Sequence, residues 1–356
     1  MKAKTAKREL DMLHGSIWNK IPLFALPVAA TAILEQLFNA SDIAIVGNFT
    51  GAQRTAAVAA VGANSPIISL LVNLFVGIAL GANVVIAHAI GQGDKNTVKK
   101  AVHTSILVSL LGGVLVAALG ELAAAPLLRL LQVPDDVFPL ALLYLRIIFA
   151  GIPFIMLYNF FFAILRALGN SRAPLRTMLL SASLNILLDL VFVALFNWGI
   201  GGAAAATVIA QAAAALYSFG CVRKLVPEDT SALRYNGDLV GNMLKLSIPM
   251  ACQLLISATG GLVVQTVVNA NEVTFIAGYT ATYKLYGLLE VAAISYGYAV
   301  TTYTGQNLGA GRLDRIRKGW GISEAVALAT SLGFAAVIFT LGTSVVGLFI
   351  SGTEAE

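Results

Sequence analysis

Long apolar runs alternate with short polar stretches along this chain. A membrane-spanning helix needs about 20 mostly apolar residues, and nine segments meet that requirement. They cover roughly residues 21–47, 56–89, 101–123, 137–164, 175–197, 201–222, 244–269, 276–304 and 321–350. Strands of a membrane β-barrel would instead read as alternating segments of about 10 residues. The pattern therefore predicts an all-α polytopic membrane protein with about nine transmembrane helices.

Composition agrees with this pattern. Of 356 residues, 58% are hydrophobic and 12% are charged, whereas a soluble domain carries about 25% charged residues. The net charge of +5 could indicate nucleic-acid binding in a soluble protein. Here the basic residues lie in short links between apolar runs. We therefore expect the bilayer as partner, and no nucleic acid.

The distribution of Lys and Arg predicts the orientation. With the N-terminus inside, the inner segments hold nineteen of the 23 basic residues, and the outer loops hold only Arg54 and Arg129. Cytoplasmic loops of membrane proteins carry such an excess. Residues 1–20 are therefore predicted to form a cytoplasmic tail, and residues 351–356 to lie outside.

Two polar links resemble one another and indicate an internal repeat. The matched positions are Gly91 and Gly309, Gly93 and Gly311, and, at a similar offset, Pro27 and Pro249. Six spans separate the copies, so both copies start on the same side, as in parallel repeats.

The repeat predicts how the chain is divided. Residues 21–225 would form an N-lobe of six transmembrane helices, residues 226–243 a cytoplasmic linker, and residues 244–356 a partial C-lobe of three helices. By symmetry a complete second lobe would also have six helices. We therefore expect the chain to lack its last three spans.

Ionisable residues inside apolar segments usually have a function or a partner, because burying them in a membrane is costly. They are Glu35, Asp42, Arg146, Asp189, Lys284 and Glu290. Asp189 lies one helical turn after Asn185, so both share a face. This pair could exchange protons or coordinate Na⁺; the alternative is a polar pair that only packs helices.

Asp42 lies toward the outer end of the first segment. Asn39 and Glu35 precede it by three and seven residues, so the three could form one stripe on a helix. The alternative is a water-exposed Asp at the membrane interface. The sequence leaves the roles of Arg146, Lys284 and Glu290 open.

The pattern of an enzyme is missing from the sequence. His14, His88 and His103 do not cluster, and no glycine-rich phosphate loop opens a helix after a strand. We expect a protein that is not an enzyme and has no cofactor.

Several short motifs, in order, resemble the multidrug and toxic compound extrusion (MATE) transporters. They are Pro27, Asn39 to Gly47, Gly81 to Asn83, Gly91 to Asp94, Arg166 to Arg172, Gly202 to Thr207, and Gly305 to Gly311. The resemblance implies two six-helix lobes around a central cavity in a prokaryotic cell membrane. It also implies a monomer that exports amphipathic, often cationic small molecules in exchange for H⁺ or Na⁺ by alternating access.

The resemblance also implies site residues. In DinF-like members of the family, an Asp of span one, an Asn/Asp pair of span five and a Thr of span six form the ion-coupling site. These match Asp42, Asn185, Asp189 and Thr207, and the first three could hold Na⁺. The substrate cavity is expected to include Glu35, Gln36, Asn39 and Gln211.

One departure narrows the resemblance. NorM-like members bind cations through an acidic residue in span seven, but residues 251–269 contain none. The sequence therefore favours a DinF-like protein. Two alternatives remain: a flippase for lipid-linked precursors, or a truncated membrane remnant that does not transport.

Overall fold

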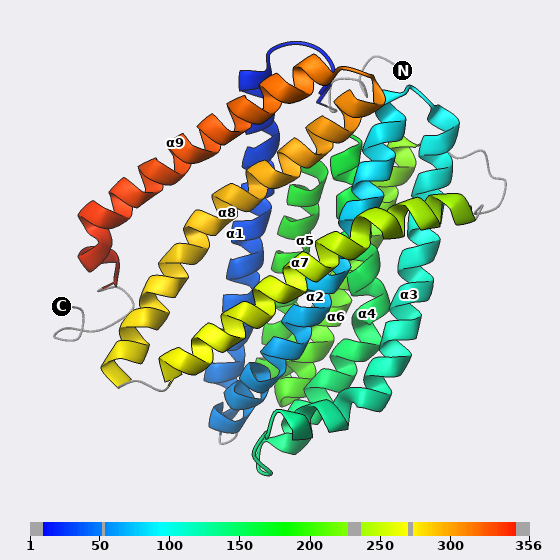
Figure 1. The fold of residues 1–356 in the computed structure, drawn as a ribbon. Coiled ribbons are helices and arrows are strands. Elements are labelled where there is room, and N and C mark those ends of the chain that lie inside the picture. The colour runs from blue at the N-terminus through cyan, green and yellow to red at the C-terminus, as the bar shows by residue number, and fades with distance from the viewer. Residues whose placement is uncertain (1–9, 52–53, 227–235, 270–272, 347–356) are drawn as a thin grey trace.

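A computed structural model describes residues 10–51, 54–226, 236–269 and 273–346. Within them the chain forms long helices that run back and forth through one bundle (Figure 1). The helices are α1 (Ile17–Phe49), α2 (Arg54–Gly91), α3 (Lys95–Leu130), α4 (Phe138–Ala167), α5 (Arg172–Asp189), a π-helical turn η2 (Leu190–Leu195), α6 (Gly199–Leu225), α7 (Gly237–Asn269), α8 (Val273–Gly309) and α9 (Leu313–Val346). The all-helical fold class is confirmed.

Seven helices in the described part of the chain are long and apolar enough to cross a membrane: α1 to α4, α5 with η2, α6, and α7. The helices α8 and α9 cover the other two predicted spans but are not among these seven, so those two spans stay predictions. Residues 1–9 of the predicted tail, residues 227–235 of the predicted linker and the C-terminal residues 347–356 lie outside the described residues.

The fifth predicted span differs from expectation in one respect. It is not one α-helix, because α5 ends at Asp189 and the next six residues form the π-helix. The Phe196 N–H accordingly donates to the Val191 carbonyl five residues earlier, at 2.9 Å. A π-helical turn is rare and is frequently found at functional sites.

The surface of the bundle carries many large apolar side chains. Leu122 is 79% exposed and Leu216 is 71% exposed, each on a helix that qualifies as a span. The core lies between helices and is richest along α4, where Leu145, Ile164 and Leu165 are fully buried. An apolar exterior around a packed interior is what a bilayer requires of its proteins.

The two links that indicated a repeat fold in the same way. Gly93 and Gly311 both adopt the left-handed conformation, with φ of +72° and +71°. Each ends its helix with the same pair of hydrogen bonds. After α2, the Gly93 N–H donates to the Ile90 carbonyl and the Asp94 N–H donates to the Ala89 carbonyl. After α8, the Gly311 N–H donates to the Leu308 carbonyl and the Arg312 N–H donates to the Asn307 carbonyl. This is the Schellman arrangement, which favours glycine at the left-handed position.

The same glycine motifs let α2 and α8 cross closely. A Cβ on Gly91 would overlap the Gln306 carbonyl oxygen, and one on Gly309 would overlap that of His88. Both pairs are related by the offset of the repeat, so the contact has an approximate twofold symmetry. Small residues of this kind let backbones approach in membrane bundles.

Candidate ion site and substrate cavity

Three helices bring the predicted ion-site residues together. Asp42 comes from α1, Asn185 and Asp189 come from the last turns of α5, and Thr207 comes from α6. The Asn185 Nδ2 donates to Asp42 Oδ1 at 3.3 Å and lies 3.4 Å from Thr207 Oγ1, while the Thr207 hydroxyl donates to Asp42 Oδ2 at 3.2 Å. All four side chains are buried, and Asn185 and Asp189 are completely inaccessible to solvent.

Asp189 is the unsatisfied member of this group. Neither of its carboxylate oxygens has a hydrogen-bond partner among the described residues, and the same holds for Asn185 Oδ1. The Asp189 and Asp42 carboxyl groups are close enough to interact directly. Two ionised carboxylates only accept hydrogen bonds, so a shared proton or a bound cation would supply the missing partner.

The donor set fits such an ion. Buried polar groups without partners call for an explanation such as an ion or a water, and hard cations prefer oxygen ligands from carboxylates and amides. Asp42, Asp189 and the Asn185 amide oxygen offer that chemistry. Within the described residues no group of three or more His, Cys, Asp or Glu side chains could hold a metal ion, so the site lacks the histidine and cysteine ligands typical of zinc.

The π-helix η2 borders the candidate ion site. Asp189 is the last residue with α-helical hydrogen bonding, and the wider turn begins at the next residue. Phe192, Phe196 and Trp198 pack against one another just beyond, with ring centroids 4.9–6.3 Å apart. The sequence did not reveal this element, because its apolar residues match an ordinary span.

Tyr144 of α4 is a second feature that the sequence did not reveal. The Tyr144 side chain is 5% exposed and lies near enough to Asp42 and Asp189 to sense their charge. Arg146 itself pairs with Glu121 of α3, with Nε and Oε2 3.7 Å apart. The Lys284 side chain lies outside the described residues, and Glu290 is exposed.

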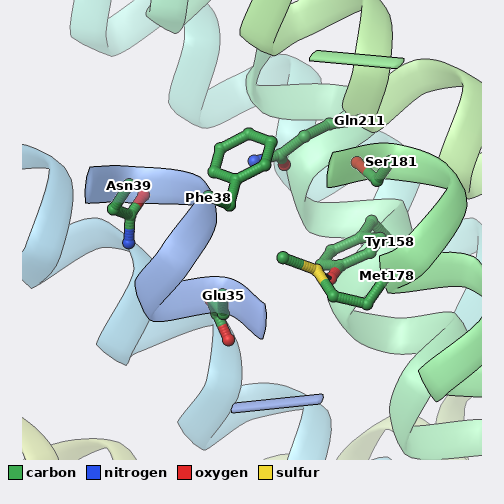
Figure 2. A pocket seen from close by; sticks show the side chains of 7 residues that line it. All are labelled: Glu35, Phe38, Asn39, Tyr158, Met178, Ser181 and Gln211. Atoms are coloured by element: carbon green, nitrogen blue, oxygen red, sulfur yellow. Dashed lines mark hydrogen bonds between the residues drawn. The ribbon is translucent and has the colours of Figure 1, made fainter. Parts of the chain in front are cut away.

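A small cavity lies between side chains of α1, α4, α5 and α6 (Figure 2). Its volume is about 40 Å³, and it is lined by Glu35, Phe38, Asn39, Tyr158, Met178, Ser181 and Gln211. Three of the four predicted cavity residues are therefore present. Gln36 is not a lining residue, because a residue one position along a helix points to a different face.

The cavity, which α4 also lines through Tyr158, lies one helical turn from the candidate ion site on α1, α5 and α6. Asn39 precedes Asp42 by three residues on α1, Ser181 precedes Asn185 by four on α5, and Gln211 follows Thr207 by four on α6. One turn is about 5.4 Å. A change in the packing of α1, α5 and α6 at one place must therefore be felt at the other.

Arg166 adds a positive charge near the cavity. It lies on the last turn of α4, where its guanidinium carbon is 4.1 Å from the centroid of the Tyr298 ring of α8. It is also close enough to Glu35 for the two charges to attract. The sequence assigned Arg166 only to an inner loop.

Buried carboxylates within a bundle of long apolar helices define a class of protein: polytopic membrane proteins with ionisable groups inside the membrane, which usually mark substrate or ion pathways. The MatE family model matches residues 27–191 and 249–355. The chain therefore belongs to the MatE family, a family of membrane transporters and not of enzymes.

Known proteins similar to this chain agree with this family assignment. The chain is 30% identical over 349 residues to the probable multidrug resistance protein YpnP of Bacillus subtilis, covering 97% of this chain and 77% of that protein. It is 24% identical to the multidrug export protein MepA of Staphylococcus aureus, covering 92% and 72%.

Among solved structures, an outward-facing multidrug resistance MATE transporter of the MOP superfamily superposes with a TM-score of 0.88. The two share 23% identity, over 97% of this chain and 77% of that one. A MOP superfamily transporter from Pyrococcus furiosus superposes with a TM-score of 0.86 at 23% identity, over 98% and 77%. At these identities the likeness concerns the fold.

Proposed function

We propose that this protein is a secondary multidrug efflux transporter that exchanges H⁺ or Na⁺ for amphipathic or cationic small molecules by alternating access. The observation that carries the proposal is the buried group of Asp42, Asn185, Asp189 and Thr207, in which the Asp189 carboxylate has no hydrogen-bond partner among the described residues. The printed names of the relatives, multidrug resistance and export proteins, support the same function.

Asp42 and Asp189 have different roles in this proposal. Asp42 is held by the Asn185 amide and the Thr207 hydroxyl, so its carboxylate has a fixed direction. The Asp189 carboxylate belongs to the same group of side chains but accepts no hydrogen bond among the described residues. Entry of one positive charge relieves the repulsion between these two carboxylates and draws α1 toward α5. Because the cavity is built on the same helices, this movement changes the space that a substrate occupies.

Substrate recognition would rest on the cavity. Glu35 supplies a negative charge, and the rings of Phe38 and Tyr158 supply aromatic surface beside it. Aromatic faces and carboxylates together attract organic cations. At about 40 Å³ the cavity holds only roughly one or two water-sized groups, whereas sites for drug-sized molecules have about 300–1,000 Å³. A substrate would therefore bind after the helices around this cavity move apart.

The same reasoning supports the finer assignments. Residues 251–269 lack an acidic side chain, which favours the DinF-like subtype. The excess of basic residues favours a cytoplasmic N-terminus in a prokaryotic cell membrane, and the repeat favours a division near residues 226–243 between an N-lobe and a partial C-lobe. We further propose a monomer. The flippase alternative would need a larger lateral groove.

The test is export of a fluorescent organic cation, ethidium, from energised cells that express the full chain. Asp189→Asn keeps the size of the side chain but removes the negative charge, so export should fall to the level of cells with empty vector. Glu324→Gln, which removes a carboxylate from α9, is the matched control and should export like wild type. Wild-type export in Asp189→Asn at equal protein level would contradict the coupling role. No export by wild type would support the non-transporting remnant.

A further inference from the structure

The segment before α1 crosses one end of the bundle. Residues 10–16 leave the α4–α5 turn, pass over the ends of α1 and α8, and reach the α8–α9 turn (dark blue at the top of Figure 1). This is the end that the charge pattern predicts to be cytoplasmic. We call residues 10–16 the strap.

One end of the strap is tied to the turn between α4 and α5. The Leu10 N–H donates to the Gly169 carbonyl at 3.0 Å. Gly169 has a φ of +79°, and a Cβ there would lie 2.6 Å from the Leu10 carbonyl oxygen. The turn therefore accepts the strap only while glycine occupies this position.

The other end is held by the α8–α9 turn, which belongs to the second repeat. Arg312 Nη1 donates to the Leu13 carbonyl at 2.7 Å, and the Arg315 guanidinium donates to the carbonyls of Gly15 at 3.3 Å and Met12 at 3.4 Å. Asn307 Nδ2 also donates to the Met12 carbonyl, at 3.2 Å. Hydrogen bonds from charged donors are the stronger kind, so this end is firmly attached.

Between its two ends the strap has an apolar anchor. The Met12 side chain is completely buried in a cluster that also contains Phe24 of α1 and Ala299 and Tyr303 of α8. Lys20 Nζ donates to the strap carbonyls of Asp11 and His14, and Asp11 accepts from the Leu13 N–H at 2.8 Å. The strap is thus an ordered element and makes both polar and apolar contacts across the two repeats.

The strap spans the same interface that the glycine crossing of α2 and α8 closes. There, Gln306 Nε2 of α8 donates to the Ala167 carbonyl of α4 at 2.8 Å, and Asn83 of α2 lies 3.5 Å from the Thr302 hydroxyl. If the two repeats separate at this end, the strap cannot keep its hydrogen bonds to both Gly169 and Arg312.

We propose that the strap is a latch on the cytoplasmic side: it holds the halves closed there, and its release from Arg312 and Arg315 must precede inward opening. This inference rests on the proposed transport by alternating access. It adds a contact that holds the two repeats together whether or not substrate or coupling ion is bound.

The test uses a reporter thiol that is buried in the closed interface. Thr302→Cys is introduced into the full chain with Cys221→Ala and Cys252→Ala, and a membrane-impermeant maleimide is applied to inside-out vesicles. Position 302 is 0% exposed, so labelling of the introduced thiol reports opening. Arg312→Ala removes a side chain whose hydrogen bonds go to the strap, and it should raise the labelling rate about tenfold. Arg317→Ala, an exposed arginine early in α9, should leave the rate unchanged.

A second variant loosens the strap from its other end. Gly169→Ala should also accelerate labelling, whereas Gly93→Ala should not, because Gly93 has a similar φ of +72° but open space around it. Unchanged labelling in both Arg312→Ala and Gly169→Ala would overturn the latch. Equal acceleration in Arg312→Ala and Arg317→Ala would also overturn it. Ethidium export plays no part in this readout, so failure of the latch is distinguishable from failure of the transport proposal.

Discussion

Among individual residues, the four ion-site side chains have different surroundings although they lie close together. Asp42 accepts two hydrogen bonds, while Asp189 accepts none among the described residues. A buried acceptor without a partner costs about 1–3 kcal/mol, and that cost is removed when an ion binds. Under the proposed function, this asymmetry would give Asp42 the role of orientation and Asp189 that of exchanging the ion.

Thr207 tests this division of roles. Thr207→Ala removes the hydroxyl that donates to Asp42 Oδ2, whereas Thr207→Ser keeps it. A hydrogen bond to a charged group contributes about 1.5–3 kcal/mol, so the alanine variant should need at least roughly ten times more coupling ion for half-maximal export. The serine variant should stay within about twofold of wild type. Equal ion dependence of both variants would show that the hydroxyl is not part of the site.

Helical spacing paired only Asn185 with Asp189, and it was the resemblance that implied the set of four with Asp42 and Thr207. The sequence could not predict the surroundings of Tyr144 and Arg166. Whether a tyrosine near a helix end is buried, or an arginine stacks on an aromatic ring of a distant helix, depends on packing between segments far apart in sequence. Gln36 does not line this cavity, because it lies on another face of α1 than Glu35; its place in the substrate cavity stays a prediction.

Among the helices and turns, the repeat is visible as a shared turn, and its first copy carries an additional cap. Asp94 accepts from the Asn96 and Thr97 N–H groups, both at 3.0 Å, and from the Thr97 hydroxyl at 2.6 Å. The Thr97 hydroxyl, followed by its N–H, lowers the pKa of Asp94. An acidic N-cap satisfies the free N–H groups of a helix start.

We therefore expect Asp94→Ala to lower the thermal unfolding midpoint of the purified protein at pH 7. Because the pKa is lower in the folded state, the ionised side chain stabilises the fold fully above the ordinary value of 3.8. This contribution is lost as the pH falls through the folded-state pKa. The difference between wild type and variant should accordingly shrink in acid; a constant difference from about pH 7 to about pH 3 would contradict the role of the charge.

The crossing of α2 and α8 gives a prediction on packing. Gly91→Ala and Gly309→Ala each place a methyl group against a backbone carbonyl that cannot rotate away, so each should lower the unfolding midpoint. Such overpacking costs about 1–3 kcal/mol. Gly62→Ala lies in the same helix α2 with open space around it. It should be neutral or stabilising by up to about 1 kcal/mol, since glycine is a poor helix former. Equal midpoints for all three variants would show that the crossing is not tightly packed.

The π-helix could not be predicted from the periodicity of apolar residues. Apolar residues from Leu190 to Leu195 suit an α-helix and a π-helix equally, and the choice depends on how the end of α5 packs against α1 and α6. The spans of the first lobe were predictable from the length of the apolar runs. Their ends were not, since the helices continue into polar caps, as α3 does from Lys95.

Across the whole molecule, the ion site and the latch occupy different regions that the helices connect. The ion site and cavity share turns of α1, α5 and α6, while the strap and the crossing of α2 and α8 join the two repeats at one end of the bundle. The proposed transport requires that an ion or substrate bound at the ion site and cavity change the packing of the strap and of the α2–α8 crossing. Helix α1 connects them, because it carries Asp42 and also contributes Phe24 to the cluster around Met12.

The proposed mechanism depends on Asp42 and Asp189 binding the coupling cation together. The direct measurement is the thermal unfolding midpoint of the purified full chain in two series: Na⁺ replacing K⁺ at constant pH, and decreasing pH at constant K⁺. A ligand at a hundredfold excess over its Kd stabilises the folded state by about 2.7 kcal/mol. Wild type should gain stability along at least one series, and Asp42→Asn with Asp189→Asn should lose that gain while Glu324→Gln keeps it. The same gain in wild type and the double variant would contradict a shared cation site.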